Sequence, residues 1–313
     1  MGSNQYWVQK ADLVVQDFIS NGGYLNAEQA SELFEIQINE SVLLGLITFK
    51  PMKAATMEIS KLGFTGRVLR GAVENQGLTL AERSAPTAGK TTLSVVELIA
   101  EADVPYGALE DHVTQGTLMT HLKNLLGKAF ARDLEYLAIQ GDTGSADLLL
   151  KKLNGFIAQC TSNTFAAGGV RLTKSTLKQM SQTMPSQYYK NSAMAYFTSK
   201  NAVIDYEDSL SSRATPLGDQ ALVSAGAQPY GGKPVVPVPE FPENLGLTTD
   251  QTIVLMCDPK NMHVGMQREV TLETAADISA RKWKVVMTAK ADFKFAHEPA
   301  VVLATGITAD AGP

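Results

Sequence analysis

The stretch that most constrains the fold of this 313-residue chain ends at Phe295. Apolar side chains occupy every odd position from Trp283 to Phe295, and the even positions are mostly Lys, Thr and Asp. Side chains of a strand alternate between its two faces, so this pattern predicts one strand over 283–295 with a single buried face. Such a strand extends about 43 Å, more than twice the usual strand length. The fold must therefore contain a long sheet with one covered face.

A strong helical pattern lies over residues 117–140 and predicts a helix about 36 Å long. We expect Leu125 or Leu126, in the middle of its apolar face, to be deeply buried. Gly141 follows at the place of a C-terminal glycine cap. A long helix beside a long one-faced strand predicts an elongated α+β slab rather than a compact enzyme fold. The apolar face consists of Leu118, Leu122, Leu125, Leu126, Ala129, Phe130, Leu134 and Leu137.

The remaining patterns divide the chain further. Amphipathic helices are predicted over 8–20 and 26–42, and they resemble an arm more than a folded domain. Strand patterns over 57–73 and 91–104 flank a polar, turn-rich segment and predict an extended hairpin with a mobile tip. Helix and strand signals alternate over 173–213. Six of the chain's 13 prolines then predict an irregular, extended segment. These prolines are Pro216, Pro229, Pro234, Pro237, Pro239 and Pro242.

Composition narrows the function classes. A net charge of −5 argues against a dedicated nucleic-acid binder, which usually carries a basic excess. Cys160 and Cys257 have no metal or redox spacing, so we expect two reduced, buried thiols. The N-terminus lacks the features of a signal peptide, and no apolar run reaches the length of about 20 residues that spans a bilayer. These features predict a protein of a cytoplasm-like compartment with no membrane partner.

Asp142-Thr143-Gly144-Ser145 spells the motif around the catalytic aspartate of pepsin-like proteases. That chemistry needs two such carboxylates sharing a proton, and each aspartate follows an apolar strand. Here Asp142 follows a helix and a glycine, and the chain contains no second copy of the motif. The string is interpreted as the turn that ends the helix.

The other chemical signals are weaker. Gly89-Lys90-Thr91 resembles the end of a phosphate-binding loop, but Ser84 replaces the required glycine and no apolar strand precedes it. We interpret it as a hairpin tip. Asn39-Glu40-Ser41 matches a glycosylation sequon, which has no meaning without secretion. Glu269, Glu273 and Asp277 are expected to form a solvated face. The four histidines lack metal-ligand spacing; they are His112, His121, His263 and His297. We therefore predict that the chain has no catalytic, cofactor-binding or metal-binding residue and is not an enzyme.

With its segments in this order, the chain resembles the major capsid proteins of tailed bacteriophages, which have the Hong Kong 97-type fold. The resemblance covers about residues 30–307. Its segments are YGALEDHVTQGTLMTHLKNLLGKAFARDLEYLAIQGD, LLLKKLNGFIAQC, SQTMPSQYYKN, YEDSLSSRATPLGDQAL, GGKPVVPVPEFPEN, KNMHVGMQREVTLE and WKVVMTAKADFKFAHEPAVVLATGI.

The resemblance implies a fold with four parts. Residues 1–55 are expected to form an N-terminal arm, and 56–105 an extended β-hairpin loop. Residues 106–160 and 267–308 are expected to form a peripheral domain with a long spine helix and a long strand. Residues 161–266 are expected to form an axial domain.

The implied function is that of a head protein. Copies are expected to assemble into hexamers and pentamers of an icosahedral shell that encloses double-stranded DNA, first in the host cytoplasm and then as part of the virion. The implied partners are other copies of the chain, a separate scaffolding protein, a portal and decoration proteins. Some family members cross-link Lys to Asn, but nothing in the sequence assigns that chemistry to Lys61 or Lys90. The alternative is an encapsulin-like nanocompartment shell of the same fold.

Overall fold

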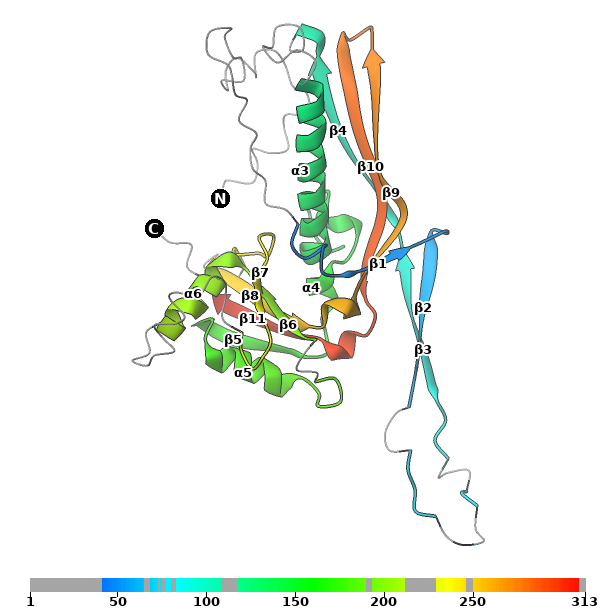
Figure 1. Ribbon diagram of the computed structural model, residues 1–313, viewed down its shortest axis with the longest axis vertical. Helices are drawn as coiled ribbons and strands as arrows, with labels where there is room; N and C mark the ends of the chain where they lie inside the picture. Colours follow the sequence, from blue (N-terminus) through cyan, green and yellow to red (C-terminus); the bar gives the residue numbers. More distant parts are fainter. Residues whose placement is uncertain are drawn as a thin grey trace.

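The computed structural model describes residues 41–64, 68–72, 74, 77–79, 83–107, 118–189, 193–211, 229–245 and 250–309. The predicted arm helices lie outside these ranges except for residues 41 and 42, as do His112 and Pro216. The described chain is elongated (Figure 1). A helix and a long sheet form one part, a second sheet with its helices lies beside their lower end, and a narrow hairpin projects away from both.

The predicted long strand is confirmed as β10 (Lys282–Phe295), inside a four-stranded sheet. The predicted helix is confirmed as α3 (Leu118–Gln140), which lies along this sheet (Figure 1). From Val285 onward, the odd-numbered side chains of β10 are all buried. The alternation therefore identified the covered face correctly. The sheet order is β1 (Thr48–Pro51), β9 (Met262–Asp277), β10 and β4 (Val96–Pro105).

The depth of burial along α3 differs from the expectation. Leu125 and Leu126 are only half-buried, whereas Phe130, Leu134 and Leu137 are at most 8% exposed. The C-terminal half of α3, from Phe130 onward, belongs to a core that also includes residues of the second sheet. The prediction that Leu125 or Leu126 is deeply buried is wrong, because the helical pattern marks a face and not where along the helix the core lies.

The second sheet has five strands and a separate core cluster of its own. Its strands β6 and β8 are buried along nearly their whole length. The helices α5 (Lys174–Thr183) and α6 (Lys200–Ser211) pack against it. The described part of the proline-rich segment, residues 229–245, contributes the short edge strand β7, as expected for a strand that ends in proline. The order is β5 (Thr164–Arg171), β11 (Val302–Thr308), β8 (Gln251–Cys257), β6 (Ala195–Thr198) and β7 (Val235–Pro237).

Short helices connect these layers. The α-helix α4 (Phe156–Gln159) follows α3 and places Phe156 against Phe293 and Phe295 of β10, with ring centroids 6.0 and 5.0 Å away. The 3-10 helices η1 (Leu150–Lys152), η2 (Pro259–Asn261) and η3 (Glu298–Ala300) occupy the remaining connections. Two of them lie at the passages between the sheets, η2 between β8 and β9 and η3 between β10 and β11.

The hairpin consists of β2 (Thr56–Gly63) and β3 (Thr87–Ser94). Two strand predictions need correction here. The strand predicted over 57–73 ends at Gly63, and the one predicted over 91–104 is two strands that meet at Val95. The Asp292 carboxylate accepts a hydrogen bond from the Ser94 amide at 2.7 Å, at the point where the chain leaves β2 and begins to pair with β10. The change of pairing partner from β2 to β10 depends on a segment far away in the sequence, so a local sequence pattern does not predict it.

Sheet membership also differs from the boundaries implied by the resemblance. β4, included in the predicted loop 56–105, belongs to the four-stranded sheet. The first strand pairing of β9 occurs at Met262 rather than at residue 267. β11, grouped with 267–308, pairs with β5 and β8 in the five-stranded sheet. The hydrogen-bonded partners of each strand, rather than the order of segments, decide this division.

Candidate assembly surfaces

The hairpin exposes large apolar side chains. Leu62 is 79% exposed and Leu69 is 91% exposed, and Phe64 is more than half exposed. At its base the hairpin is held by its own ladder and by the Ser94 amide on Asp292. Farther along, Lys90 Nζ lies 2.6 Å from Glu58 Oε1 across the two strands. Exposed apolar side chains on a projecting element are typical of a contact surface for another protein.

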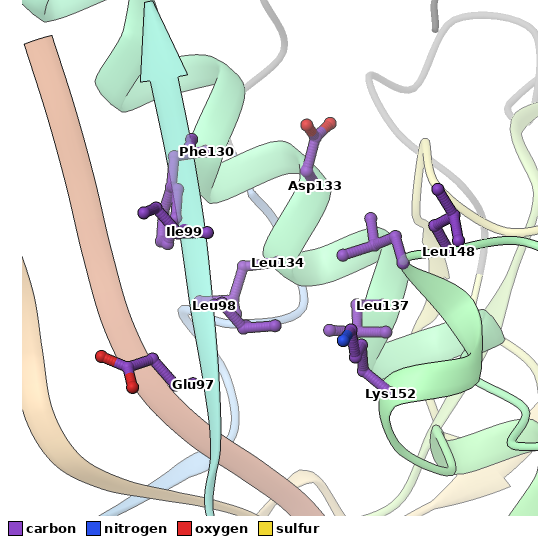
Figure 2. Close-up of a pocket in the computed structure, with 11 residues that line it drawn as sticks. Glu97, Leu98, Ile99, Phe130, Asp133, Leu134, Leu137, Leu148 and Lys152 are labelled. Atoms are coloured by element: carbon purple, nitrogen blue, oxygen red, sulfur yellow. The ribbon is translucent and has the colours of Figure 1, made fainter. Parts of the chain in front are cut away.

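An apolar groove lies between β4 and α3 and has a volume of about 310 Å³. Figure 2 shows Leu98 of β4 and Leu134 of α3 facing each other across it. Two groove residues are largely exposed, Ile99 at 67% and Leu148 at 65%. The groove is lined by Leu98, Ile99, Ala100, Phe130, Leu134, Leu137, Leu148 and Leu149, with Glu97, Asp133 and Lys152 among them.

The edge of β4 runs beside this groove. β4 is the last strand of its sheet, and among the described residues it pairs only with β10 over its ten residues. Its outward N–H and C=O groups are a template for another extended segment. The groove and the strand edge together form a surface suited to an apolar segment in extended conformation.

The face of the sheet opposite α3 carries a ladder of ion pairs. Lys282, Lys284 and Lys290 of β10 pair with Asp103, Glu101 and Glu97 of β4, the second pair at 3.3 Å and the third at 4.0 Å. The pairs of Lys284 and Lys290 are partly exposed and contribute little stability, whereas Asp103 is buried. The three pairs do offset the lysine charges, so this face is not a basic surface of the kind that binds nucleic acid.

The protease-like string is confirmed as a turn. The Gly144 amide donates to Asp142 Oδ1 at 2.8 Å, and the Asp142 amide donates to the Leu150 carbonyl. Asn154 Oδ1 accepts from the amide of Thr143 at 2.9 Å. The Asp142 carboxylate therefore closes its own turn, which leads the chain from α3 into η1.

The string Gly89-Lys90-Thr91 lies within β3, in register with residues 59–61 of β2. The interpretation as a hairpin tip is wrong, because these residues belong to the paired part of the hairpin. A strand does not form the helix N-terminus that would hold a phosphate.

The cysteines are free thiols, as predicted; Cys257 is fully buried as expected, whereas Cys160 is only half-buried. Burial, followed by the charge of Glu298, raises the pKa of Cys160 to about 12. His263 is buried and Glu273 is exposed, while His297 lies against the Tyr188 ring with centroids 4.8 Å apart. Across the described ranges, no three His, Cys, Asp or Glu residues gather as a metal site. Within the same ranges, no helix is long and apolar enough to cross a membrane.

One notable site escaped the sequence analysis. Glu135 of α3 is 1% exposed, and its Oε2 accepts hydrogen bonds from the amides of Leu43 and Leu44 at 3.0 and 3.2 Å. These residues belong to the turn through which residues 1–40 join the body. The residue type of Glu135 does not indicate burial. Its position between Leu134 and Leu137, on the covered side of the helix, is the signal that could have indicated it.

No family model matches the sequence. The chain is 31% identical over 303 residues to the "Putative prophage capsid protein YqbE" of Bacillus subtilis (strain 168). The alignment covers 95% of this chain and 97% of that relative. The chain belongs to this capsid protein family. The family resemblance of the sequence segments is thereby confirmed.

Solved structures agree on the fold. The capsid of a native GTA particle matches with a TM-score of 0.68 at 15% identity, covering 93% of this chain and 98% of that one. The procapsid of satellite phage P4, solved with its size-determination protein, matches with a TM-score of 0.63 at 12% identity, covering 95% of this chain and 98% of that one. The SrpI encapsulin of Synechococcus elongatus matches with a TM-score of 0.64 at 11% identity, covering 93% of this chain and 95% of that one. The capsid protein has the predicted α+β, Hong Kong 97-type fold.

Proposed function

We propose that this capsid protein is the major head protein of a tailed bacteriophage and that its copies form hexamers and pentamers of an icosahedral shell around double-stranded DNA. The observation that carries the proposal is a pair of complementary surfaces on one chain. The hairpin presents exposed Leu62 and Leu69, and the groove beside β4 is apolar with an unpaired strand edge.

The two surfaces belong on different copies. The hairpin leaves the four-stranded sheet at the start of β4 and projects away from α3 (Figure 1), whereas the groove lies between β4 and α3. It therefore does not reach the groove of its own chain. Repetition of this head-to-tail contact generates a ring when the rotation closes.

The parts of the fold follow from this proposal. Residues 1–55 act as an arm, and 56–105 supply the hairpin that extends over a neighbour. Residues 106–160 and 267–308 are assigned to the peripheral domain and 161–266 to the axial domain. Two strands differ from these ranges, because β4 belongs to the four-stranded sheet and β11 to the five-stranded sheet. The partners are a separate scaffolding protein, a portal and decoration proteins. DNA is enclosed without sequence-specific binding, and the subunit has no enzymatic role.

The contact is tested with three aspartate variants. Leu69→Asp alters the hairpin and Leu148→Asp alters the groove, whereas Ile278→Asp changes a residue that is 82% exposed in the turn after β9. Negative-stain images and light scattering should show shells from the parent and from Ile278→Asp. The first two variants should remain as folded subunits. Normal shells from both Leu69→Asp and Leu148→Asp would overturn this contact.

The encapsulin alternative rests on the likeness to the SrpI shell. Particles purified from cells distinguish the two functions, because a phage head packages DNA and an encapsulin holds a cargo protein. Particles that contain one enzyme at fixed stoichiometry and no portal would favour the encapsulin.

A further inference from the structure

Three parts of the molecule meet at Glu135. The spine helix α3 supplies the carboxylate, the turn over 41–47 supplies two amide donors, and the loop after β7 supplies Glu240 nearby. The Glu240 carbonyl in turn accepts a hydrogen bond from Gln140 of α3 at 2.8 Å. The junction therefore joins the start of the described chain, the long helix and the loop leading out of the five-stranded sheet.

The carboxylate of Glu135 is incompletely satisfied. Oε2 accepts the two amides, but Oε1 is buried and makes no hydrogen bond within the described part of the chain. A buried polar atom without a partner has a substantial desolvation cost. A residue that served packing alone would be replaced by leucine or glutamine at lower cost, so the charge itself calls for an explanation.

We propose that Glu135 is a positioning residue that holds the turn over 41–47, which residues 1–40 precede in the chain, on the spine helix. Leu43 and Leu44 are the anchored residues, and residues 1–40 precede this turn in the chain. The position of the turn is then set by one side chain of α3 and not by its hydrophobic contacts alone. Its relevance to shells rests on the proposed function, in which arms contribute contacts between subunits.

The sign of the pH dependence follows from the surroundings. Burial raises the pKa of Glu135, and the amides of the turn oppose this with a smaller effect. The carboxylate of Glu240, whose own pKa is raised by burial, adds negative charge at the junction. Arg132 and Asp133 of α3 lie near Glu240, and the turn over 41–47 carries no charged residue. The bound turn thus holds the proton of Glu135 more tightly than a released, solvated state would, so the hold weakens as the pH rises.

Hydrogen exchange of the full-length, unassembled protein tests the inference. Protection factors of the Leu43 and Leu44 amides, corrected for intrinsic exchange, are compared from acidic to neutral buffer. In the parent they should fall as the pH rises. Glu135→Gln keeps an acceptor and cannot ionise, so its protection should not change with pH. Glu135→Ala should lower the protection about tenfold, the size expected for loss of a hydrogen bond.

Glu101→Gln is the matched control, since it removes a carboxylate from the opposite face of the sheet and should behave as the parent does. If Glu135→Ala does not fold, the comparison of the parent with Glu135→Gln still decides. The same pH dependence in the parent and in Glu135→Gln would overturn the inference, as would unchanged protection in a folded Glu135→Ala. Assembly is scored separately, because failure of the parent to form shells would count against the proposed function and not against this anchor.

Discussion

The amide of Gly155 donates a hydrogen bond to the carbonyl of Gly141, 2.8 Å away, and brings the chain after η1 against the end of the spine helix. A Cβ on Gly141 would lie 2.6 Å from the carbonyl oxygens of Leu137 and Leu153. Gly141 does not adopt a positive φ, so it is required by close backbone approach and not by a left-handed helix cap. The expected glycine at the helix end is present, but for a different physical reason.

We therefore expect Gly141→Ala to destabilise the subunit by about 1–3 kcal/mol or more, because backbone atoms must move to admit the methyl group. Gly127→Ala in the middle of α3 is the matched control. Its added Cβ would meet only the tip of Met287 at 4.0 Å, so better helix propensity should stabilise the subunit by about 0.5–1 kcal/mol. Denaturant unfolding of both variants measures the difference. Equal effects would contradict the close approach.

The depth of burial along α3 gives a second prediction. Leu137→Ala should cost about 2–5 kcal/mol, since Leu137 is fully buried in the core shared by the helix and both sheets. Leu125→Ala makes the same chemical change at a half-buried position and should cost clearly less. Thermal melts of the unassembled subunits compare the two. A larger loss of stability in Leu125→Ala would show that the core lies nearer the N-terminal end of α3.

The hairpin gives a third prediction, on proteolysis. Trypsin should cut after Arg83 readily in unassembled subunits and much more slowly in mature shells, where the hairpin contacts a neighbour. Lys90 should be cut less readily in both states, because it lies in β3 and pairs with Glu58. Peptide mapping over time follows each site. Equal cleavage after Arg83 in subunits and shells would contradict the contact.

Deletion of the hairpin end is a fourth prediction. Removal of residues 78–86 leaves β2 and β3 intact and touches neither hydrophobic core. The subunit should therefore melt like the parent and fail to form closed shells. The melting temperature and electron micrographs report the two effects separately, and normal shells from this variant would contradict the role of the hairpin.

The thiols give a fifth prediction. Because the pKa of Cys160 is raised to about 12, this thiol stays protonated at neutral pH and should react slowly with a maleimide in the folded subunit. Unfolding lowers the pKa of Cys160 to the ordinary range, so the thiol ionises at lower pH in the unfolded chain than in the folded one. The free energy of unfolding should therefore fall as the pH rises from about 9 toward 12. Labelling with and without guanidinium measures the reactivity, with Cys160→Ser as control. Rapid labelling of the folded parent, absent in Cys160→Ser, would contradict the burial of this thiol.

The sequence by itself determined the elements whose signals are periodic and local. The alternation ending at Phe295 identified β10 and its covered face, and the helical pattern identified α3 nearly to the residue. It also placed Asp142 in a turn and, through the order of its segments, predicted the capsid fold. These results share one cause, because backbone geometry imposes the periods 2 and 3.6 on any strand or helix with one buried face.

Only the tertiary structure decided which segments meet. The chain around Val95 looks uniform in sequence, yet it divides between the hairpin and the long sheet because β10 is a partner from nearly 200 residues away. The burial of Phe130 rather than Leu125 depends on where the second sheet packs, and Gly141 is needed because Gly155 returns to it. Glu135 is polar in the sequence and buried in the fold, since its partners are backbone amides of another segment. Local sequence patterns indicate which face of a helix or strand is covered, and long-range packing decides which segment covers it.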